Sequence, residues 1–403
     1  MATRTPSQGL KILENLHKKY PNHLSTKNSV INAYIKLGKH DTAINMIKDT
    51  PSKKSDMTSL RHQAWLTHKE NNIVKEREIW HQILEINYMS QIHNKIETFI
   101  ARSQGDLTLK FSDIPLFCVE RNEMVRLPFF LDYYRKLGVT KFIFIDNNSH
   151  DGSLEFLLQQ PDCYVFWTND SYNQSGHGLT WLNYLINQSG ILHDSQWYII
   201  ADVDEFLVYP NCEIRSLKTL IAYLNTTDAE AVPSFMLDMY PKDLENSYPN
   251  FLEEHIYFYN NYQIFYQVES PYIQPSGGIR SHIFDEHNSY YVKTALFKKI
   301  DQPIYLISST HQTTPFLTSN LITTFLHYKF AGDFELYTKS EINNKQHSGG
   351  GSRYRIYHNW ITNNPDTNFI DLDKTTKYQN SQQLVDLGLI KTTEEWEKFC
   401  ENQ

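Results

Sequence analysis

The first part of the chain has the hydrophobic spacing of helices. Between residues 1 and 105, apolar side chains recur every three or four positions, as in SVINAYIKLGKHDTAINMIKDTP and RHQAWLTHKENNIVKEREIWHQILEIN. This spacing places the apolar residues on one face of a helix. We therefore predict an all-α domain over residues 1–105 that ends near ARSQGDLTLKFSD, a polar segment containing glycine.

The two helical segments also resemble tetratricopeptide repeats. They lie about 34 to 36 residues apart, and each contains an aromatic residue, a small or polar turn and an amphipathic helix. The first repeat fits at Tyr34, Leu37, Gly38 and Ala43. The second has Glu70 and Asn71 where Leu-Gly is expected, so an ordinary helical cap is the alternative interpretation.

After residue 105 the pattern changes to strands that alternate with helices. The strand-like runs are IPLFCVE, KFIFID, YVFWT and QWYIIADVDEF, and the helical patterns between them are EMVRLPFFLDYYRKLG, SLEFLLQQ and LTWLNYLINQSG. This alternation is typical of an α/β domain with a mostly parallel sheet flanked by helices. We predict such a domain over residues 106–403, with Gly138 ending its first helix.

Polar residues follow the predicted strands. The segments are Glu120 to Glu123, Asp146 to Ser149, Gly176 to Gly178, and the acids Asp202, Asp204 and Glu205. Because ligands of doubly wound sheets bind at the carboxyl ends of the strands, we expect these segments to line one edge of the sheet.

The composition narrows the range of partners. The chain has 403 residues and a formal net charge of -8, which argues against a nucleic-acid-binding surface spread over the molecule. Small molecules or glycans are the expected partners. The four cysteines are far apart and indicate neither a zinc site nor a disulfide framework. Without a secretory signal or a membrane-length apolar run, we expect a cytoplasmic protein, either free or peripheral at the inner face of the membrane.

The three acids after the last strand suggest a cation site. In an extended segment Asp202 and Asp204 point to one side, and Val203 and Glu205 to the other. Two converging carboxylates would repel each other, and a Mg²⁺ or Mn²⁺ ion would remove that cost and bridge substrate phosphates. The alternative is that these acids end the strand and meet surface lysines or arginines.

The motifs together resemble the family 2 glycosyltransferases, whose nucleotide-binding half has the GT-A fold. The similarity is closest to a bacterial subgroup related to the family 92 domain, and it covers roughly residues 113 to 391. It is carried, in order, by RNE, DNNSHDGS, the helix from Gly178 to Asn183, DVDEF, FMLDMYP, SGGIRSHIF, HYKF and YQNSQQLVDLGLI. The resemblance implies a nucleotide-binding half over residues 106–210, and an acceptor-binding half with C-terminal helices over 211–403.

The resemblance assigns residues to a nucleoside diphosphate sugar, with a UDP-sugar as the expected donor. Asp146 would receive the base and Asp202 would face the ribose and the metal. The full set expected to bind the donor is Glu120, Arg121, Asn122, Glu123, Asp146, Asn148, Gly178, Asn183, Asp202, Arg280 and Lys329. A turn with a surface arginine is the alternative for GGIR, and a solvated face is the alternative for Lys329.

The resemblance also implies a divalent metal, Mn²⁺ or Mg²⁺, as cofactor. Asp204 would be a direct ligand beside Asp202, and a histidine from the later half would complete the shell. His327 and His311 are the candidates, although a lone histidine is more often structural.

Inversion at the sugar carbon requires a carboxylate that takes the proton of the acceptor hydroxyl. Asp238 in LDMYP is the predicted base and Glu205 the competing candidate. The implied activity is transfer of a sugar to a glycan or lipid-linked acceptor in bacterial surface polysaccharide synthesis. The N-terminal helices would then bind a protein partner, a second copy or the acceptor.

Two other interpretations stay open on the sequence. A sugar nucleotidyltransferase also uses paired acids and a metal, although ERNEMVRLP stands where its glycine-rich basic loop would be. The second is a catalytically inert α/β module with a partner-recruiting helical domain.

Overall fold

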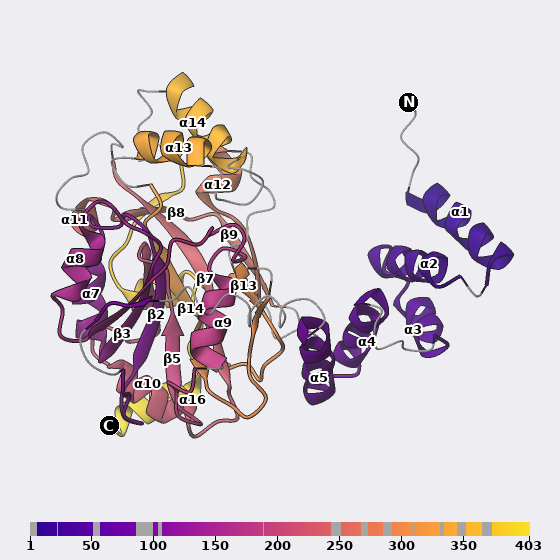
Figure 1. The fold of residues 1–403 in the computed structure, drawn as a ribbon, viewed down its shortest axis with the longest axis horizontal. Helices are drawn as coiled ribbons and strands as arrows, with labels where there is room; N and C mark the ends of the chain where they lie inside the picture. Colours follow the sequence, from indigo (N-terminus) through magenta and orange to yellow (C-terminus); the bar gives the residue numbers. More distant parts are fainter. Residues whose placement is uncertain are drawn as a thin grey trace. The chain divides into compact units, whose positions relative to one another are not determined.

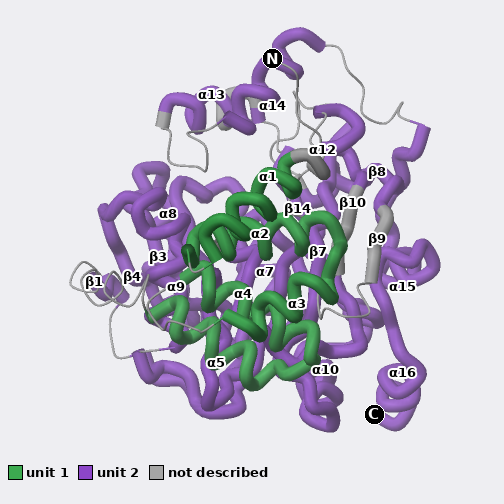
Figure 2. The backbone as a smooth tube through the Cα atoms, turned by 90° about the vertical axis from the view of Figure 1, so that its right-hand side faces the viewer, with its two compact units in different colours: residues 1–91 green, residues 92–403 purple. Residues whose placement is uncertain are grey.

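The structure, a computed structural model, describes residues 6–21, 23–50, 57–85, 100–103, 107–187, 189–242, 251–266, 273–284, 292–307, 309–330, 334–344, 352–364 and 373–403. The chain divides into two compact units, Met1–Gln91 and Ile92–Gln403, which Figure 2 draws in green and purple.

The described part of the first unit is built of helices. They are α1 (Pro6–Lys19), α2 (Leu24–Lys36), α3 (His40–Lys48), α4 (Met57–Lys69) and α5 (Ile73–Leu84). Asn72 begins α5 by accepting a hydrogen bond from the backbone N–H of Lys75 at 3.1 Å. Apolar faces bury Leu60 and Ala64 of α4 against Ile79 and Ile83 of α5. The predicted helical character of this region is confirmed.

The second unit contains a large mixed sheet. The strand order is β1-β4-β3-β2-β5-β11-β7-β14-β6, with β8 beside β7 and β15 beside β8. Strands β4, β3, β2 and β5 run parallel, as do β7 and β14, while the other neighbours are antiparallel. The strands are β1 (Ile100–Ala101), β2 (Pro115–Glu120), β3 (Lys141–Asp146), β4 (Cys163–Trp167), β5 (Trp197–Ile200), β6 (Glu205–Val208), β7 (Ala231–Tyr240), β8 (Tyr257–Tyr259), β11 (Val292–Lys298), β14 (Thr323–His327) and β15 (Thr375–Lys377).

The remaining helices of the described ranges belong to the second unit. They are α7 (Leu127–Leu137), α8 (Ser153–Leu158), α9 (Leu179–Asn187), α10 (Leu217–Leu224), α11 (Phe251–Glu254), α12 (Gly278–Ile283), α13 (Phe334–Asn344), α14 (Ser352–Asn363), α15 (Ser381–Asp386) and α16 (Glu394–Glu401). In Figure 1, α7 and α8 lie beside the sheet, while α13 and α14 lie beyond one end of it. Two small antiparallel sheets pair β9 (Tyr262–Tyr266) with β10 (Ile273–Gly277), and β12 (Leu306–Ile307) with β13 (Ser309–Thr313). The predicted α/β class is confirmed.

Helix α7 shows how the sequence builds the core. Leu127, Phe130, Leu131 and Tyr134 recur at helical spacing and are all fully buried. The Phe130 ring packs edge-on against Phe144 of β3. Gly138 ends the helix in the left-handed conformation, with φ of 115°, as the sequence predicts.

The division between the units comes early. It lies between Gln91 and Ile92, and the predicted boundary at residue 105 lies outside the described residues. Ile100 and Ala101 pair with Trp167 and Phe166 of β4, so this short strand belongs to the sheet of the second unit. None of the helices in the described ranges is long and apolar enough to cross a membrane.

Candidate active site

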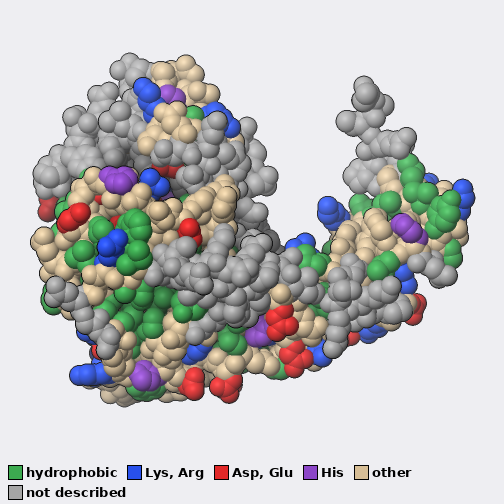
Figure 3. All heavy atoms as spheres, viewed as in Figure 1, with side chains coloured by type: hydrophobic (Ala, Val, Ile, Leu, Met, Phe, Trp, Pro, Cys, Tyr) green, Lys and Arg blue, Asp and Glu red, His purple; other side chains and the backbone are tan. Residues whose placement is uncertain are grey.

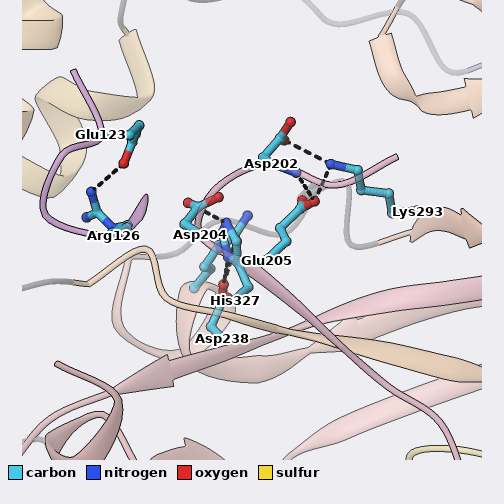
Figure 4. A network of polar contacts seen from close by, with 9 residues as sticks. Glu123, Arg126, Asp202, Asp204, Glu205, Asp238, Lys293 and His327 are labelled. Atoms are coloured by element: carbon cyan, nitrogen blue, oxygen red, sulfur yellow. Dashed lines mark hydrogen bonds and ion pairs between the residues drawn. The ribbon is translucent and has the colours of Figure 1, made fainter. Parts of the chain in front are cut away.

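The chain turns sharply at the acids that follow β5. The strand ends at Ile200, and the N–H of Glu205 donates to the carbonyl oxygen of Asp202 at 3.0 Å. The Glu205 carboxylate folds back to accept the N–H of Asp202 at 2.8 Å. The prediction of one extended segment, with Glu205 facing away from Asp202, is therefore wrong. Because the backbone turns, Asp202 and Glu205 lie together and Asp204 faces elsewhere (Figure 4).

Lys293 of β11 joins Asp202 and Glu205. Its ammonium donates to Asp202 Oδ2 at 2.8 Å and also to Glu205 Oε2. The Lys293 side chain is wholly buried, as is that of Glu205. Although burial opposes the charge, the two carboxylates raise the pKa of Lys293 above its ordinary value. The ammonium is therefore a fixed cation within this turn.

The second acid of the motif contacts a histidine. Asp204 Oδ2 lies 3.3 Å from Nε2 of His327, the last residue of β14. The other ring nitrogen, Nδ1, lies 2.6 Å from Oδ1 of Asp238 on β7. Burial lowers the pKa of His327, but the two flanking carboxylates outweigh it and the net shift is upward. An imidazolium between two carboxylates is the favoured state.

Arg280 closes this buried group from α12. Its Nη2 donates to Asp238 Oδ1 at 2.5 Å and lies 2.9 Å from His327 Nδ1. Gly277, at the start of α12, has a φ of 97° and lies against the backbone of Asn261, since a Cβ there would be 1.9 Å from the Asn261 carbonyl oxygen. The GGIR motif thus supplies a buried partner for Asp238, and Arg280 lies behind the surface rather than on it.

Asp238 is badly placed to serve as the catalytic base. It is wholly buried between Arg280 and His327, and these cations outweigh burial and lower its pKa. Glu205, the competing candidate, has its pKa raised to about 7 by burial and by the charge of Asp202, but its side chain is only 1% exposed. Asp202, by contrast, has a side chain that is 43% exposed.

Two further cations lie beside Asp204. A small depression is lined by Glu123, Arg126, Asp204 and Lys329. Arg126 lies at the start of α7 and pairs with Glu123 at 2.9 Å. Burial disfavours ionisation of Asp204, but His327, Arg126 and Lys329 outweigh it and hold its pKa well below the ordinary value. Sequence reasoning missed Arg126, whose one signal is a cation just before Leu127-Pro128, where α7 begins.

The loops after β2 and β3 are tied to each other. The backbone N–H of Asn122 donates to Ser149 Oγ at 2.9 Å, and Asn122 Oδ1 accepts the N–H of His150 at 2.8 Å. The backbone N–H of Glu123 donates to Ser153 Oγ, and that of Met124 donates to Asp151 Oδ2. RNE and DNNSHDGS therefore form one cross-linked block, as their predicted place at one edge requires.

Glu120 and Asp146 lie beneath this block, in register on β2 and β3. Both are buried. Burial, followed by the hydrogen bond and charge of Asp146, raises the pKa of Glu120 well above its ordinary value. Asp146 Oδ1 accepts the N–H of Ser149 at 3.1 Å. Asp146 therefore shapes its loop through Oδ1, and its predicted contact with a nucleotide base stays a prediction.

Other predicted residues are divided between the loops and the scaffold. Arg121 is exposed, and Asn148 has a positive φ of 60° in its loop. Gly178 has a positive φ of 79°, and a Cβ there would press against Val119 Cγ2 at 3.0 Å. Asn183 bonds Leu306 in both directions at 2.9 Å, which joins α9 to β12. Asn183 therefore supports the fold rather than the site.

His311 does not join the acids. Its Nδ1 lies 3.1 Å from the carbonyl oxygen of Val292. Burial, followed by the charge of Lys293, lowers the pKa of His311 to about 3. A neutral structural imidazole is the result.

The residues do not fit the predicted divalent metal. Asp202 is held by Lys293, and Asp204 by His327. Within the described ranges, no group of three or more His, Cys, Asp or Glu side chains is arranged to hold a metal ion. The chemistry available at this edge is that of side-chain cations and carboxylates.

A scan against models of known protein families and a search of curated proteins found no match for this chain. On the face drawn in Figure 3, the acidic and basic side chains of the coloured residues are interspersed.

Proposed function

We propose that this chain is a glycosyltransferase that takes a sugar from a nucleoside diphosphate sugar. The observation that carries the proposal is the depression where Arg126 and Lys329 lie beside Asp204. Cations suit the two phosphates of such a donor, and a carboxylate accepts hydrogen bonds from ribose or sugar hydroxyls. A UDP-sugar is the donor that the motifs favour.

The position of the depression supports the same proposal. Arg126 begins the helix after β2, and Asp204 follows β5, the parallel neighbour of β2. Donors of open α/β sheets bind outside the carboxyl ends of neighbouring parallel strands. The cross-linked loops after β2 and β3 lie at the same ends, so they would flank the nucleoside. The proposed fold for this unit is GT-A.

Proton transfer from the acceptor is assigned to Asp202. An acceptor hydroxyl must reach the base directly, and Asp238 and Glu205 are closed to it by burial. Asp202 is 43% exposed, and Lys293 and the turn fix its position. The transfer proposed is an inverting one, to a glycan or lipid-linked acceptor on the cytoplasmic side of the membrane.

The helical first unit is proposed to be a tetratricopeptide-like binding domain. Helix pairs such as α4 and α5 pack through small apolar clusters, as repeat units do. Its partner would be a protein of the same pathway, a second copy of this chain or the acceptor itself.

The test is isothermal titration of the full chain with a panel of nucleoside diphosphate sugars. We expect one donor to bind and the corresponding free nucleoside diphosphate to compete with it. Chromatographic detection of nucleoside diphosphate release then reports turnover. If none of the nucleoside diphosphate sugars binds to a chain whose fold circular dichroism has verified, the proposal is refuted and an inert binding module is favoured.

A further inference from the structure

Lys293 occupies the place that the DVDE motif would offer to a divalent cation. Its ammonium donates to Asp202 at 2.8 Å and to Glu205, so it joins the two carboxylates that the turn brings together. A divalent cation between these carboxylates would have to displace the ammonium or lie against it. Like charges at such short range repel strongly, and more so where water is excluded.

Lys293 has little freedom to move aside. It lies on β11, an interior strand that pairs with β5 on one side and β7 on the other. Its side chain is wholly buried, and its ammonium lies 5.8 Å from the centre of the Phe325 ring. A lysine at the rim of a site could rotate into solvent and leave its place to a metal ion. The enclosed Lys293 ammonium has no such route.

The other acid of the motif is also neutralised by the chain itself. Asp204 contacts His327, which Asp238 holds from behind. Arg126 and Lys329 line the same depression. Each acid of the motif that reaches the surface therefore has a resident side-chain cation.

We propose that the ammonium of Lys293 takes the place of a divalent cation at the turn from Asp202 to Glu205, and that the chain binds a diphosphate-bearing ligand without a metal ion. The second half of this statement rests on the proposed function. Arg126 and Lys329 would meet the phosphate charge, and Lys293 would hold the acid turn in shape beside them.

The first test measures Mn²⁺ alone, without any nucleotide, from the loss of the free-ion signal in electron paramagnetic resonance. Wild type and Lys298→Met, a control on the same strand, are expected to show no site at these acids. Lys293→Met frees the two carboxylates and should bind one Mn²⁺ at least about tenfold more tightly than wild type. The double variant Lys293→Met with Glu205→Gln should lose this gain.

Two outcomes would overturn the proposal. One is a wild-type Mn²⁺ site that Asp202→Asn removes, and the other is a folded Lys293→Met variant that gains no affinity. If circular dichroism finds the Lys293→Met variant unfolded, Mn²⁺ binding is compared between wild type and Asp202→Asn instead. Equal and weak Mn²⁺ binding by both supports the proposal.

The second test titrates the donor found in the panel, once in EDTA and once in Mn²⁺. Dissociation constants within about twofold of each other support binding without a metal, and loss of binding in EDTA overturns it. If no donor binds in either buffer, the proposed function fails, while the Mn²⁺ experiment still decides the role of Lys293.

Discussion

Asp238 and His327 lie in register on the parallel strands β7 and β14, and their side chains meet at 2.6 Å. On the other side of β14, His327 lies in register with Glu205 of the antiparallel strand β6. The sheet thus delivers a carboxylate, an imidazole and a second carboxylate to adjacent positions. The imidazole also contacts Asp204, which lines the depression, so His327 links Asp238 to Asp204.

Asp238→Asn should lower the free energy of unfolding by about 3 kcal/mol, because it leaves Arg280 buried without its counter-charge and His327 with Asp204 alone. Urea denaturation followed by circular dichroism measures this. The control is Asp132→Asn, which removes the exposed partner of Lys136 and should cost less than about 1 kcal/mol. Equal effects of the two variants would mean that the buried group contributes no more than a surface pair.

Gly277→Ala should destabilise the second unit by about 2 kcal/mol or more, since the new Cβ would meet the Asn261 carbonyl oxygen at 1.9 Å in a backbone conformation of positive φ. Differential scanning calorimetry provides the measurement. Gly9→Ala is the matched control: nothing lies within 4 Å of its Cβ position in α1, and alanine there should be neutral or mildly stabilising. A Gly277→Ala variant as stable as wild type would contradict the close approach.

His311 should make the protein sensitive to mild acid. Its pKa is lowered to about 3 in the fold from an ordinary 6.5, so between these values the unfolded chain takes up a proton that the folded chain does not. Stability therefore falls as the pH drops below 6.5, by up to about 1.4 kcal/mol per pH unit. Urea unfolding at pH 7 and pH 5 should show a loss that is smaller in His311→Gln by about 2 kcal/mol. The same loss in both proteins would refute the assignment.

Arg126→Gln should weaken binding of the donor about tenfold, because it removes one of the cations assigned to the diphosphate. Titration calorimetry with the donor identified in the panel measures the change. Arg135→Gln is the control from the far end of α7, where Arg135 pairs with Asp162 at 2.6 Å, and it should bind the donor as wild type does. Equal affinities of Arg126→Gln and wild type would remove Arg126 from the site.

Asp202→Asn should retain donor binding and lose transfer by a factor of about 100 or more, as expected for a general base. The amide keeps the size of the carboxylate but cannot take the proton. Turnover is measured as nucleoside diphosphate release with acceptor present, beside the dissociation constant of the donor. Near-normal transfer would show that another group accepts the proton.

Local patterns were enough for the parallel strands β2 to β5 of the sheet, but not for β11 or β14. The runs before Glu120, Asp146 and Asp202 become β2, β3 and β5, since strand length and apolar character determine them locally. Gly138 ends α7 because a left-handed residue is required there. These features depend on neighbours in the sequence, which a single chain displays.

The roles of the acids depended on contacts that no local pattern contains. Glu205 turns back toward Asp202 because both bind Lys293, which lies 91 positions beyond Asp202 in the sequence. Asp238 follows an apolar run and precedes a turn, as an accessible base would, but β14 pairs beside it and buries it against His327. The register of distant strands decided which acids stay accessible.

The sequence separation between the contacting residues also determines when the site forms during folding. The contact between Asp238 and His327 spans 89 positions, and that between Asp202 and Lys293 spans 91. Contacts of such long range form only after the loops between them have closed. A chain still emerging during synthesis, or one cut before β11, has the acid motif without Lys293, His327 and Lys329. The site would therefore become active only when the fold is complete, and an unfinished chain would be inactive.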